Sequence, residues 1–415
     1  MEMEMEMEYP ADFRCPISME LMNDPVTICT GVTYERKNIE KWFFTYKKKA
    51  CPATMQSIQS FHLTPNHTLK RLIQSWLKNH ESQSCSSPSP PRPSVKHGEL
   101  VSLLSSVGSS PFKVTSLKKL RSIIEMGEET KADFIRSGGV EVVVQIVVQI
   151  LVEGSDFVTF RVCEEALGVL YQLPFSEQDK TLEILSKPES MRSMAIVLQR
   201  GSAGARLYAI SIFRKVAKTD YNWNFMINDQ GIDFFKSLLE LVSDEICTKA
   251  SSCALEVLIE IMSLSKKSRL QAIEAGAICV LIELLPDSSR SKCEKILLLM
   301  KLLCECAEGR LALVEHSMGI PAVSKKIFHV SNTATKIGVK IMWLICSFHP
   351  KERVLEEMLI YGLVNKFLTL LHMEGRSSTK DEVVKMLKLH ANSWRQYPCF
   401  PCELNEYLGL VNVAC

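Results

Sequence analysis

Three cysteines and three histidines near the N-terminus have side chains that could bind a metal: Cys15, Cys29, Cys51, His62, His67 and His80. A structural zinc site takes four such ligands, usually supplied as close Cys-x2-Cys or His-x3–5-His pairs. His62 and His67 are close enough, but the cysteines are 14 and 22 positions apart and supply no close pair. We therefore expect no metal and no cofactor here, and interpret the cysteines as small buried apolar residues.

No other pattern supplies a catalytic group. Fifteen cysteines without framework spacing, in a chain with no secretory signal, predict reduced thiols of the cytosol or nucleus. Cys399 and Cys402 have no second pair to complete a zinc site. P-loop, serine-hydrolase and zinc-protease motifs do not occur, so we predict no catalytic nucleophile. Four further cysteines lie in apolar helical patterns that indicate burial rather than an activated thiolate: Cys163, Cys253, Cys304 and Cys346.

The elements that position these residues are a hairpin and two helices. Val26–Cys29 and Val32–Tyr34 flank a Thr-Gly turn signal. The next helix has four apolar residues at i, i+3, i+4 and i+7: Ile39, Trp42, Phe43 and Tyr46. Asn66 is expected to cap a second helix, whose apolar stripe is Leu69, Leu72, Ile73, Trp76 and Leu77. Without metal, polar pairs must help to hold this domain, and the candidates are Glu20, Asp24, Arg36 and Lys37.

The long C-terminal region is helical by pattern and repeats. Glycines open apolar helices at Gly139, Gly231, Gly276, Gly319 and Gly362. The last four are 45, 43 and 43 residues apart, and the first gap of 92 is two such periods. The missing member should lie near residue 185, where an apolar helix restarts after a proline. A period of about 40–47 residues is typical of armadillo or HEAT repeats; an irregular helical bundle is the alternative.

Composition divides the chain into parts. Residues 1–8 alternate Met and Glu, which predicts a disordered tail at 1–9. Ten of the 16 residues 82–97 are Ser or Pro, so we expect a linker at 85–99 between a domain at 10–84 and repeats at 100–395, with a tail at 396–415. The 49 basic and 47 acidic residues argue against nucleic-acid binding. The longest apolar stretch, Val142–Val152, is too short to span a bilayer, so we predict no transmembrane segment.

Ordered motifs in residues 10–84 carry a family resemblance. The stretch FRCPISMELMNDPVTICTGVTYERKNIEKWF, followed by CPATMQ and LTPNHTLKRLIQSWL, closely resembles the U-box, a zinc-free relative of the RING domain. NFMINDQGIDFFKSLLELV and SRLQAIEAGAICVLIELL resemble armadillo repeats. Together with the linker, these parts resemble the plant U-box/armadillo ubiquitin ligases over nearly the full chain. The resemblance implies a mostly α fold, in which a small U-box with a short β-hairpin and helices precedes an armadillo-type α-solenoid.

The resemblance also implies an activity. A U-box recruits a ubiquitin-conjugating enzyme, which carries ubiquitin as a thioester, and the ligase holds the ubiquitin so that a substrate lysine can attack. By motif position, the apolar groove that docks this carrier would comprise Ile17, Met19, Trp42 and Pro52. We expect this groove to be exposed, as suits a small transient interface. Core packing is the alternative for Ile17 and Trp42.

One position departs from the family pattern. Many relatives carry a basic side chain just after the CPxT turn, where it contacts both ubiquitin and its carrier. Met55 stands there in this chain, and Gln56 beside it is a candidate hydrogen-bond donor. Because of this departure, a non-catalytic armadillo scaffold with a weak U-box is the alternative to an active ligase.

The resemblance implies that the repeats bind the protein substrate in a groove formed by the stacked third helices of successive repeats. These helices lack the Trp and Asn pattern of importin-type armadillo proteins, which disfavours basic nuclear-import signals. Four lysines predict either a basic strip or a solvated face: Lys236, Lys325, Lys326 and Lys366. The resemblance further implies a U-box homodimer and a role in plant stress or defence signalling. We expect a cytoplasmic location, with the nucleus or a membrane periphery as alternatives.

Overall fold

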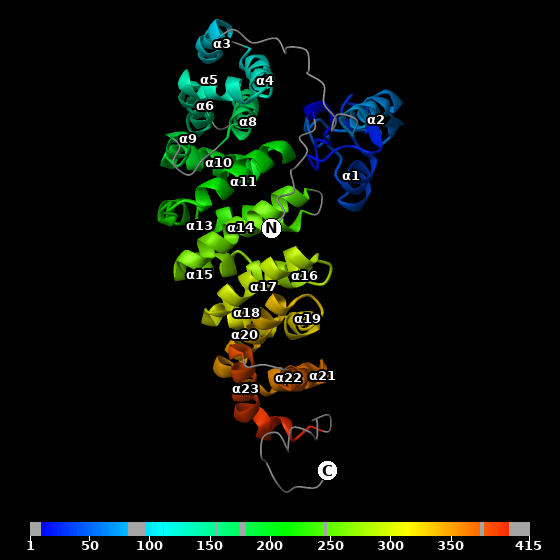
Figure 1. Ribbon diagram of the computed structural model, residues 1–415, viewed down its shortest axis with the longest axis vertical. Helices are drawn as coiled ribbons and strands as arrows, with labels where there is room; N and C mark the ends of the chain where they lie inside the picture. The colour runs from blue at the N-terminus through cyan, green and yellow to red at the C-terminus, as the bar shows by residue number, and fades with distance from the viewer. Residues whose placement is uncertain are drawn as a thin grey trace. The chain divides into compact units, whose positions relative to one another are not determined.

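A computed structural model of the chain describes residues 10–81, 97–110, 112–153, 157–174, 180–244, 247–373 and 377–397. The chain divides into two compact units, Met1–Met226 with Asp244–Cys253, and Ile227–Ser243 with Ala254–Cys415. The predicted tail at 1–9, most of the predicted linker, and Cys399 and Cys402 lie outside the described residues. Figure 1 shows a small N-terminal domain with strands, followed by a series of helices.

The N-terminal domain contains a three-stranded antiparallel sheet. Its strands β1 (Pro25–Thr27), β2 (Thr33–Glu35) and β3 (Thr64–Pro65) lie in the order β2-β1-β3. The predicted hairpin is confirmed, with bounds shifted by one or two residues. The turn takes more residues than expected because Gly31, at φ 79°, donates its N–H to Ile28 O at 2.9 Å. The two-residue strand β3 carries no alternation, and the sequence analysis missed it.

The central helix of this domain changes its winding. It begins as α1 (Arg36–Glu40) and continues directly as a π-helical segment, η2 (Lys41–Thr45). The other short helical element of the domain, the 3-10 turn η1 (Ala11–Phe13), precedes the sheet. Ile39 and Phe43 are buried, as predicted, but Tyr46 is 37% exposed. The Tyr46 N–H donates to Lys41 O at 3.0 Å, an i→i+5 bond. The wider turn moves Tyr46 off the apolar face that regular helical spacing predicted.

The second helix, α2 (His67–Glu81), begins where the sequence indicated. Asn66 caps it, because its Oδ1 accepts from the Leu69 N–H at 3.0 Å. Ile73 is buried in the domain core, whereas Leu72 is 53% exposed, so its placement in the apolar stripe was wrong. The core itself comprises Cys15, Ile17, Met22, Val26, Ile28, Tyr34, Ile39, Phe43, Cys51, Ile58 and Ile73.

The repeat region consists of consecutive helices, most of them in triplets. The first unit contains α3 (His97–Ser109), α4 (Lys113–Ile124), α5 (Glu128–Arg136), α6 (Gly139–Val148), α7 (Ile150–Glu153), α8 (Phe157–Tyr171), α9 (Lys180–Leu185), α10 (Pro188–Arg200) and α11 (Ala203–Ala217). The second contains α13 (Gly231–Ser243), α15 (Lys266–Glu274), α16 (Ala277–Leu284), α17 (Arg290–Cys304), α18 (Ala307–Glu315), α19 (Gly319–Lys326), α20 (Asn332–Phe348), α21 (Glu352–Ile360), α22 (Leu363–His372) and α23 (Ser378–Trp394). Residues of both units occur in α12 (Asn224–Asp229) and α14 (Thr248–Leu264).

The glycines at the starts of third helices act in two ways. Gly276 and Gly362 have φ 88° and 69°, the left-handed region in which a side chain is strained. Gly319 instead lies close to the preceding helix, since a Cβ there would be 2.0 Å from Leu313 O. The predicted missing member is confirmed as α10, which has Pro188 in its first turn. Proline suits that position because its φ already matches the helix.

The interiors of the repeats are apolar. Within the first unit, α8 packs against α4, α6 and α11, and within the second α20 packs against α17 and α23. Cys163, Cys253, Cys304 and Cys346 are buried, as predicted. Among the described residues no single helix is long and apolar enough to cross a bilayer. The pair Glu128–Arg136 and Gly139–Val152 reaches that length only across a 74° bend, and α6 within it is largely buried in the repeats.

Candidate functional site

Two loops of the N-terminal domain share one sequence pattern and one backbone architecture. The first loop (residues 14–22) has the sequence Cys-Pro-x-x-Met from Cys15 to Met19, and the second loop (residues 50–58) has it from Cys51 to Met55. An isolated antiparallel bridge closes each loop, Arg14 with Leu21 and Ala50 with Ser57. The pattern was visible in the sequence as CPISM and CPATM, but only the structure shows that the two turns are equivalent.

The backbone bonds of the two loops correspond one to one. In the first loop, the Cys15 N–H donates to Glu20 O and the Met19 N–H donates to Cys15 O, both at 2.8 Å. In the second loop, the Cys51 N–H donates to Gln56 O at the same distance. The Met55 N–H likewise donates to Cys51 O at 2.8 Å. Each loop is thus fixed by its own backbone, which is what a docking surface requires for preorganisation.

Buried thiols anchor the loops to the rest of the domain. Cys15 Sγ accepts from the Glu35 N–H at 3.3 Å, and Cys51 Sγ lies 3.0 Å from the Tyr34 hydroxyl. Tyr34 also accepts from the Ala53 N–H at 3.1 Å. Burial raises the pKa of Tyr34, which therefore stays a neutral phenol. Burial opposes ionisation of Cys51, yet hydrogen bonds from neighbours including Tyr34 outweigh it and lower the thiol pKa.

The structure places the cysteines as the sequence analysis predicted, with one exception. Cys15 and Cys51 are fully buried, but Cys29 is exposed in the hairpin turn, so the prediction of burial was wrong for it. Within the described part of the chain, no three His, Cys, Asp or Glu side chains come together to hold a metal ion. His62 instead bonds its neighbour Thr64, with 3.3 Å between Nδ1 and Oγ1.

Trp42 connects the central helix to the second loop. Its indole Nε1–H donates to Ala50 O at 2.8 Å, and its ring is only partly buried. Of the other predicted docking residues, Met19 is partly exposed, whereas Ile17 is 2% exposed and Pro52 is buried. The expectation of an exposed groove was therefore wrong for Ile17 and Pro52. Ile17 belongs to the core of the domain, which is the alternative that the sequence left open for it. Pro52 lines a cavity together with residues of the repeats.

Met55 and Gln56 lie at the end of the second loop. The Met55 side chain is 60% exposed, and the Gln56 side chain is exposed as well. The Gln56 carbonyl closes the loop by accepting from Cys51. The position at which many relatives carry a basic group thus presents an apolar thioether and a neutral amide to solvent.

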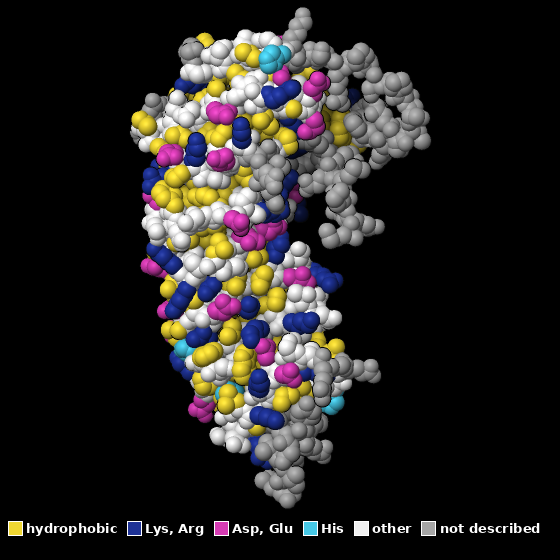
Figure 2. All heavy atoms as spheres, turned by 60° about the vertical axis from the view of Figure 1, so that its left-hand side comes forward, with side chains coloured by type: hydrophobic (Ala, Val, Ile, Leu, Met, Phe, Trp, Pro, Cys, Tyr) yellow, Lys and Arg dark blue, Asp and Glu magenta, His cyan; other side chains and the backbone are white. Residues whose placement is uncertain are grey.

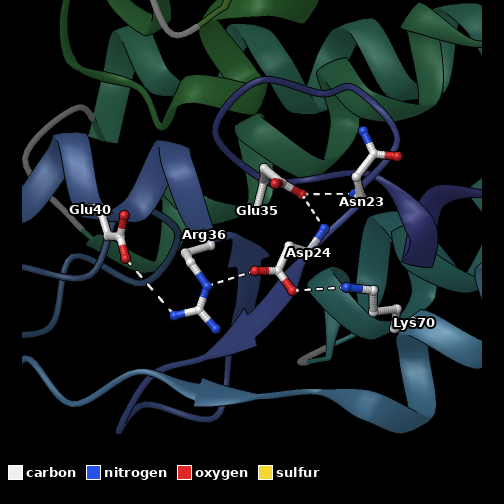
Figure 3. Close-up of polar contacts among 6 residues, drawn as sticks. All are labelled: Asn23, Asp24, Glu35, Arg36, Glu40 and Lys70. Carbon is white, nitrogen blue, oxygen red and sulfur yellow. Dashed lines mark hydrogen bonds and ion pairs between the residues drawn. The ribbon is translucent and has the colours of Figure 1, made fainter.

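A polar network joins the strands to both helices of the domain (Figure 3). The Asp24 carboxylate accepts from Arg36 Nε at 2.6 Å and from Lys70 Nζ at 3.2 Å. These two bonds lower the pKa of Asp24. Glu35 Oε2 accepts from the backbone N–H groups of Asn23 at 2.8 Å and of Asp24 at 2.9 Å. The sequence analysis identified Asp24 and Arg36 correctly but missed Glu35 and Lys70.

The remaining two candidates for this network lie elsewhere. Lys37 is exposed on α1, and Glu20 accepts a hydrogen bond from Thr248 in the repeats. Lys70 could have been found only by its position one turn inside α2, because 46 residues separate it from Asp24 in sequence.

The lysines of the third helices do not form a strip of equivalent cations. Lys326 Nζ donates to Pro286 O at 2.9 Å, and Lys366 Nζ donates to Ser324 O at 2.6 Å. Both bonds satisfy carbonyls at or just beyond the C-terminus of a neighbouring repeat's third helix, the position that cations favour. Lys236 pairs with Asp233 on its own helix at 3.5 Å. On the face drawn in Figure 2, basic and acidic side chains are interspersed.

The sequence matches two family models, one in the N-terminal domain and one in the repeats. Residues 9–82 match the U-box domain, and residues 98–407 match the plant U-box protein ARM repeat region. Among curated proteins of Arabidopsis thaliana, the E3 ubiquitin-protein ligase PUB23 is 36% identical, with 96% of this chain and 97% of that protein covered. The E3 ubiquitin-protein ligase PUB22 is 32% identical, with 97% and 99% covered.

One similar solved structure is a computationally designed armadillo repeat protein for modular peptide recognition. The similarity covers 59% of this chain and 99% of the designed chain, at 17% identity and a TM-score of 0.45. The two family matches and the near-complete coverage of the relatives define the class. The chain belongs to the plant U-box/armadillo-repeat family of ubiquitin ligases. The predicted fold class is confirmed, and so is the prediction of a U-box-type ubiquitin-protein ligase.

Proposed function

We propose that the U-box binds a ubiquitin-charged conjugating enzyme at the two loops and the central helix. The observation that carries this proposal is the link between the predicted docking residues. Met19 lies on the first loop, Pro52 lies on the second loop, and the Trp42 indole bonds the second loop directly at Ala50 O. The two loops also share one core through Cys15 and Cys51. Residues 33 positions apart in sequence are thus held on one core, which is what a preorganised docking surface needs.

The role of this chain in the chemistry is positional. An uncharged substrate lysine attacks the thioester carbonyl carbon, the new C–N bond forms as the C–S bond breaks, and the conjugating enzyme's cysteine leaves as a thiol. Nothing in that step requires a nucleophile from the ligase. The ligase contributes by restricting the motion of the carried ubiquitin relative to the substrate, which converts a bimolecular encounter into an oriented reaction. We propose that the armadillo repeats hold the substrate protein.

A conjugation assay tests the proposal. The full chain is incubated with ubiquitin-activating enzyme, a panel of conjugating enzymes, ubiquitin and ATP, and chains on the ligase are followed. We expect chains with at least one conjugating enzyme, and their loss in Met19→Ala and Trp42→Ala. Leu72→Ala is the matched control, because Leu72 is an exposed apolar residue of α2, outside both loops. A wild-type protein that forms no chains with any member of the panel would contradict the proposal.

One observation favours the second candidate, a scaffold with a weak U-box. Met55 exposes an apolar side chain where many relatives carry a basic one. The two functions separate when binding and transfer are measured together on the same protein. A scaffold would bind the conjugating enzyme and leave the rate of ubiquitin release from its thioester unchanged, whereas a ligase accelerates that release.

We also propose that the U-box pairs with a second copy. Phe44 is 61% exposed, and its ring centroid lies 6.3 Å from that of Phe61, which is 36% exposed. This pair provides apolar surface outside the two loops. Sedimentation of Phe44→Asp against the wild-type chain tests the idea, since a monomer is expected only for the variant. Within the proposal the ligase acts in the cytoplasm, in protein turnover linked to plant stress or defence signalling.

A further inference from the structure

The first loop is bonded to a helix of the repeats. Cys247, directly before α14, directs its Sγ to Ser18 O at 3.6 Å. The hydroxyl of Thr248, the first residue of that helix, donates to Glu20 Oε1 at 2.9 Å. All four residues belong to the first compact unit. Burial raises the pKa of Cys247 to about 12, so this thiol stays protonated and able to donate.

The second loop is bonded to a different helix of the same unit. Arg161 of α8 donates from Nη1 to Ala53 O at 3.3 Å. The Glu164 carboxylate, which is 6% exposed, accepts from the same Arg161 nitrogen at 3.0 Å. Glu164 in turn accepts from the Ser202 N–H at 2.6 Å, just before α11. A buried carboxylate therefore aims the guanidinium at the loop.

Between these bonds the two surfaces enclose a cavity that residues of both line, among them Met19, Pro52 and Tyr208. Gly204 of α11 lies beneath Met19, since a Cβ at Gly204 would be 3.9 Å from Met19 Sδ. The same Cβ would be 3.8 Å from the Tyr208 hydroxyl, which also lines this region. Both distances are ordinary van der Waals contacts, so a methyl group fits at this position without displacing Met19.

We propose that α8, α11 and the start of α14 form a cis-docking surface that holds the two loops in a closed state and competes with the conjugating enzyme. The inference rests on the proposed function, because it takes the same loops to be the carrier's docking site. It places Met19 and Pro52 of the two loops against the repeat helices, with which both residues line one cavity. A surface on the same chain competes as an intramolecular ligand and lowers the apparent affinity for the carrier by the fraction of molecules that are closed.

The first test opens the closed state by a steric wedge. Gly204→Trp, in the full chain, places a bulky ring against Met19 of the first loop, and Gly204→Ala is the matched control. We expect the apparent dissociation constant for the conjugating enzyme to fall roughly three- to tenfold in Gly204→Trp and to stay unchanged in Gly204→Ala. Arg161→Ala should act in the same direction, with Arg136→Ala, an exposed arginine of α5, as its control. Equal affinities in wild-type, Gly204→Trp and Arg161→Ala would overturn the inference.

The second test locks the closed state. Ser18→Cys places a thiol beside Cys247, and mild oxidation should join the two by a disulfide. We expect the oxidised full chain to bind the conjugating enzyme at least about tenfold more weakly, and reduction with a phosphine to restore binding. The double variant Ser18→Cys/Cys247→Ser cannot form the bond and is the control. Unchanged binding by the locked form would overturn the inference.

Failure of the proposed function is distinguishable from failure of the closed state. If no form binds any conjugating enzyme, the proposed function is wrong. In that case, formation of the disulfide in Ser18→Cys still tests whether the closed state exists. Its rapid formation in Ser18→Cys, and slower formation once Gly204→Trp is added, would support a closed state. No disulfide in Ser18→Cys under conditions that oxidise accessible thiols would exclude the contact.

Discussion

Met19 and Met55 occupy equivalent positions in two loops that are 36 residues apart in the chain. Their φ angles are 60° and 58°, in the left-handed region that disfavours a side chain by about 1–2 kcal/mol. Each donates its backbone N–H to the carbonyl of the cysteine four residues earlier, at 2.8 Å. The same strained turn is thus built twice, and each copy ends at a methionine on the rim of the proposed docking site.

Restoring a basic side chain at the second methionine should strengthen transfer. In Met55→Arg, a guanidinium at this exposed position can contact both ubiquitin and its carrier by charge-assisted bonds. We expect the rate of ubiquitin release from the conjugating enzyme to rise roughly three- to tenfold, which corresponds to about 1 kcal/mol of added stabilisation. Single-turnover discharge onto free lysine measures this. Met55→Leu keeps the apolar character and should leave the rate unchanged; an equal gain in both variants would contradict the role of charge.

We expect the hydroxyl of Tyr34 to contribute to the stability of the N-terminal domain. Tyr34→Phe removes the acceptor of the partly buried Ala53 N–H and a partner of the buried Cys51 Sγ. Because buried groups then lose their partners, we expect a loss of about 1–3 kcal/mol in the free energy of unfolding. Urea unfolding followed by intrinsic fluorescence measures it. Tyr46→Phe, at a residue that is 37% exposed, should cost much less, and equal costs would argue against the anchoring role.

The Asp24 network predicts a pH dependence of stability. Bonds from Arg36 and Lys70 lower the pKa of Asp24 in the folded chain. The stabilisation is therefore fully present above the unfolded value of about 3.9 and is lost as the pH falls through the lower folded value. Since the carboxylate is 41% exposed, we expect Asp24→Asn to cost at most about 1 kcal/mol at pH 7.

Urea unfolding of wild-type and Asp24→Asn at pH 7 and at about pH 3.5 checks this window. The difference between the two proteins should shrink at the lower pH. Glu40→Gln is the control, because Glu40 is 3.9 Å from Arg36 and contributes a weaker pair. A difference of the same size at both values would mean that Asp24 acts through its shape and not through its charge.

Two glycines of the repeats should respond differently to alanine. Gly276→Ala meets no atom within 4 Å but keeps φ near 88°, so its cost is backbone strain of about 1 kcal/mol. Gly319→Ala places Cβ 2.0 Å from Leu313 O, and the backbone must move, which we expect to cost about 3 kcal/mol. Thermal unfolding of the two variants ranks them. The reverse order would contradict the distinction between strain and close packing.

Local chemistry made the repeats predictable from sequence. The glycines that open α6, α13, α16, α19 and α22 are required by a backbone angle or by a close approach, so their position recurs with the period of the repeat. The cap at Asn66 and the buried faces of Ile39 and Phe43 depend on neighbours within one turn. Such features leave a readable pattern because the residues that create them are adjacent in the chain.

Features that depend on distant residues could not be predicted. Lys70 reaches Asp24 across 46 positions, and Cys247 reaches Ser18 across 229. The apolar residues around the π-helical segment follow ordinary α-helical spacing, so the sequence does not indicate the wider turn that displaces Tyr46. Motif position placed Ile17 and Pro52 on the proposed docking site, but no pattern in the sequence indicates that Ile17 packs in the domain core or that Pro52 lies beside repeat helices.

A ladder of lysines connects consecutive repeats of the second unit. Lys292 donates to Val242 O at 3.3 Å, Lys326 to Pro286 O at 2.9 Å, and Lys366 to Ser324 O at 2.6 Å. In each case the donor belongs to the later repeat and the acceptor to the earlier one. Truncation from the C-terminus therefore leaves the last remaining repeat with backbone carbonyls that have lost their lysine donor. Truncation from the other end removes the carbonyl acceptor and leaves a lysine that water can solvate. Truncation series of this protein should be asymmetric, with deletions from the C-terminal side eroding the remainder faster.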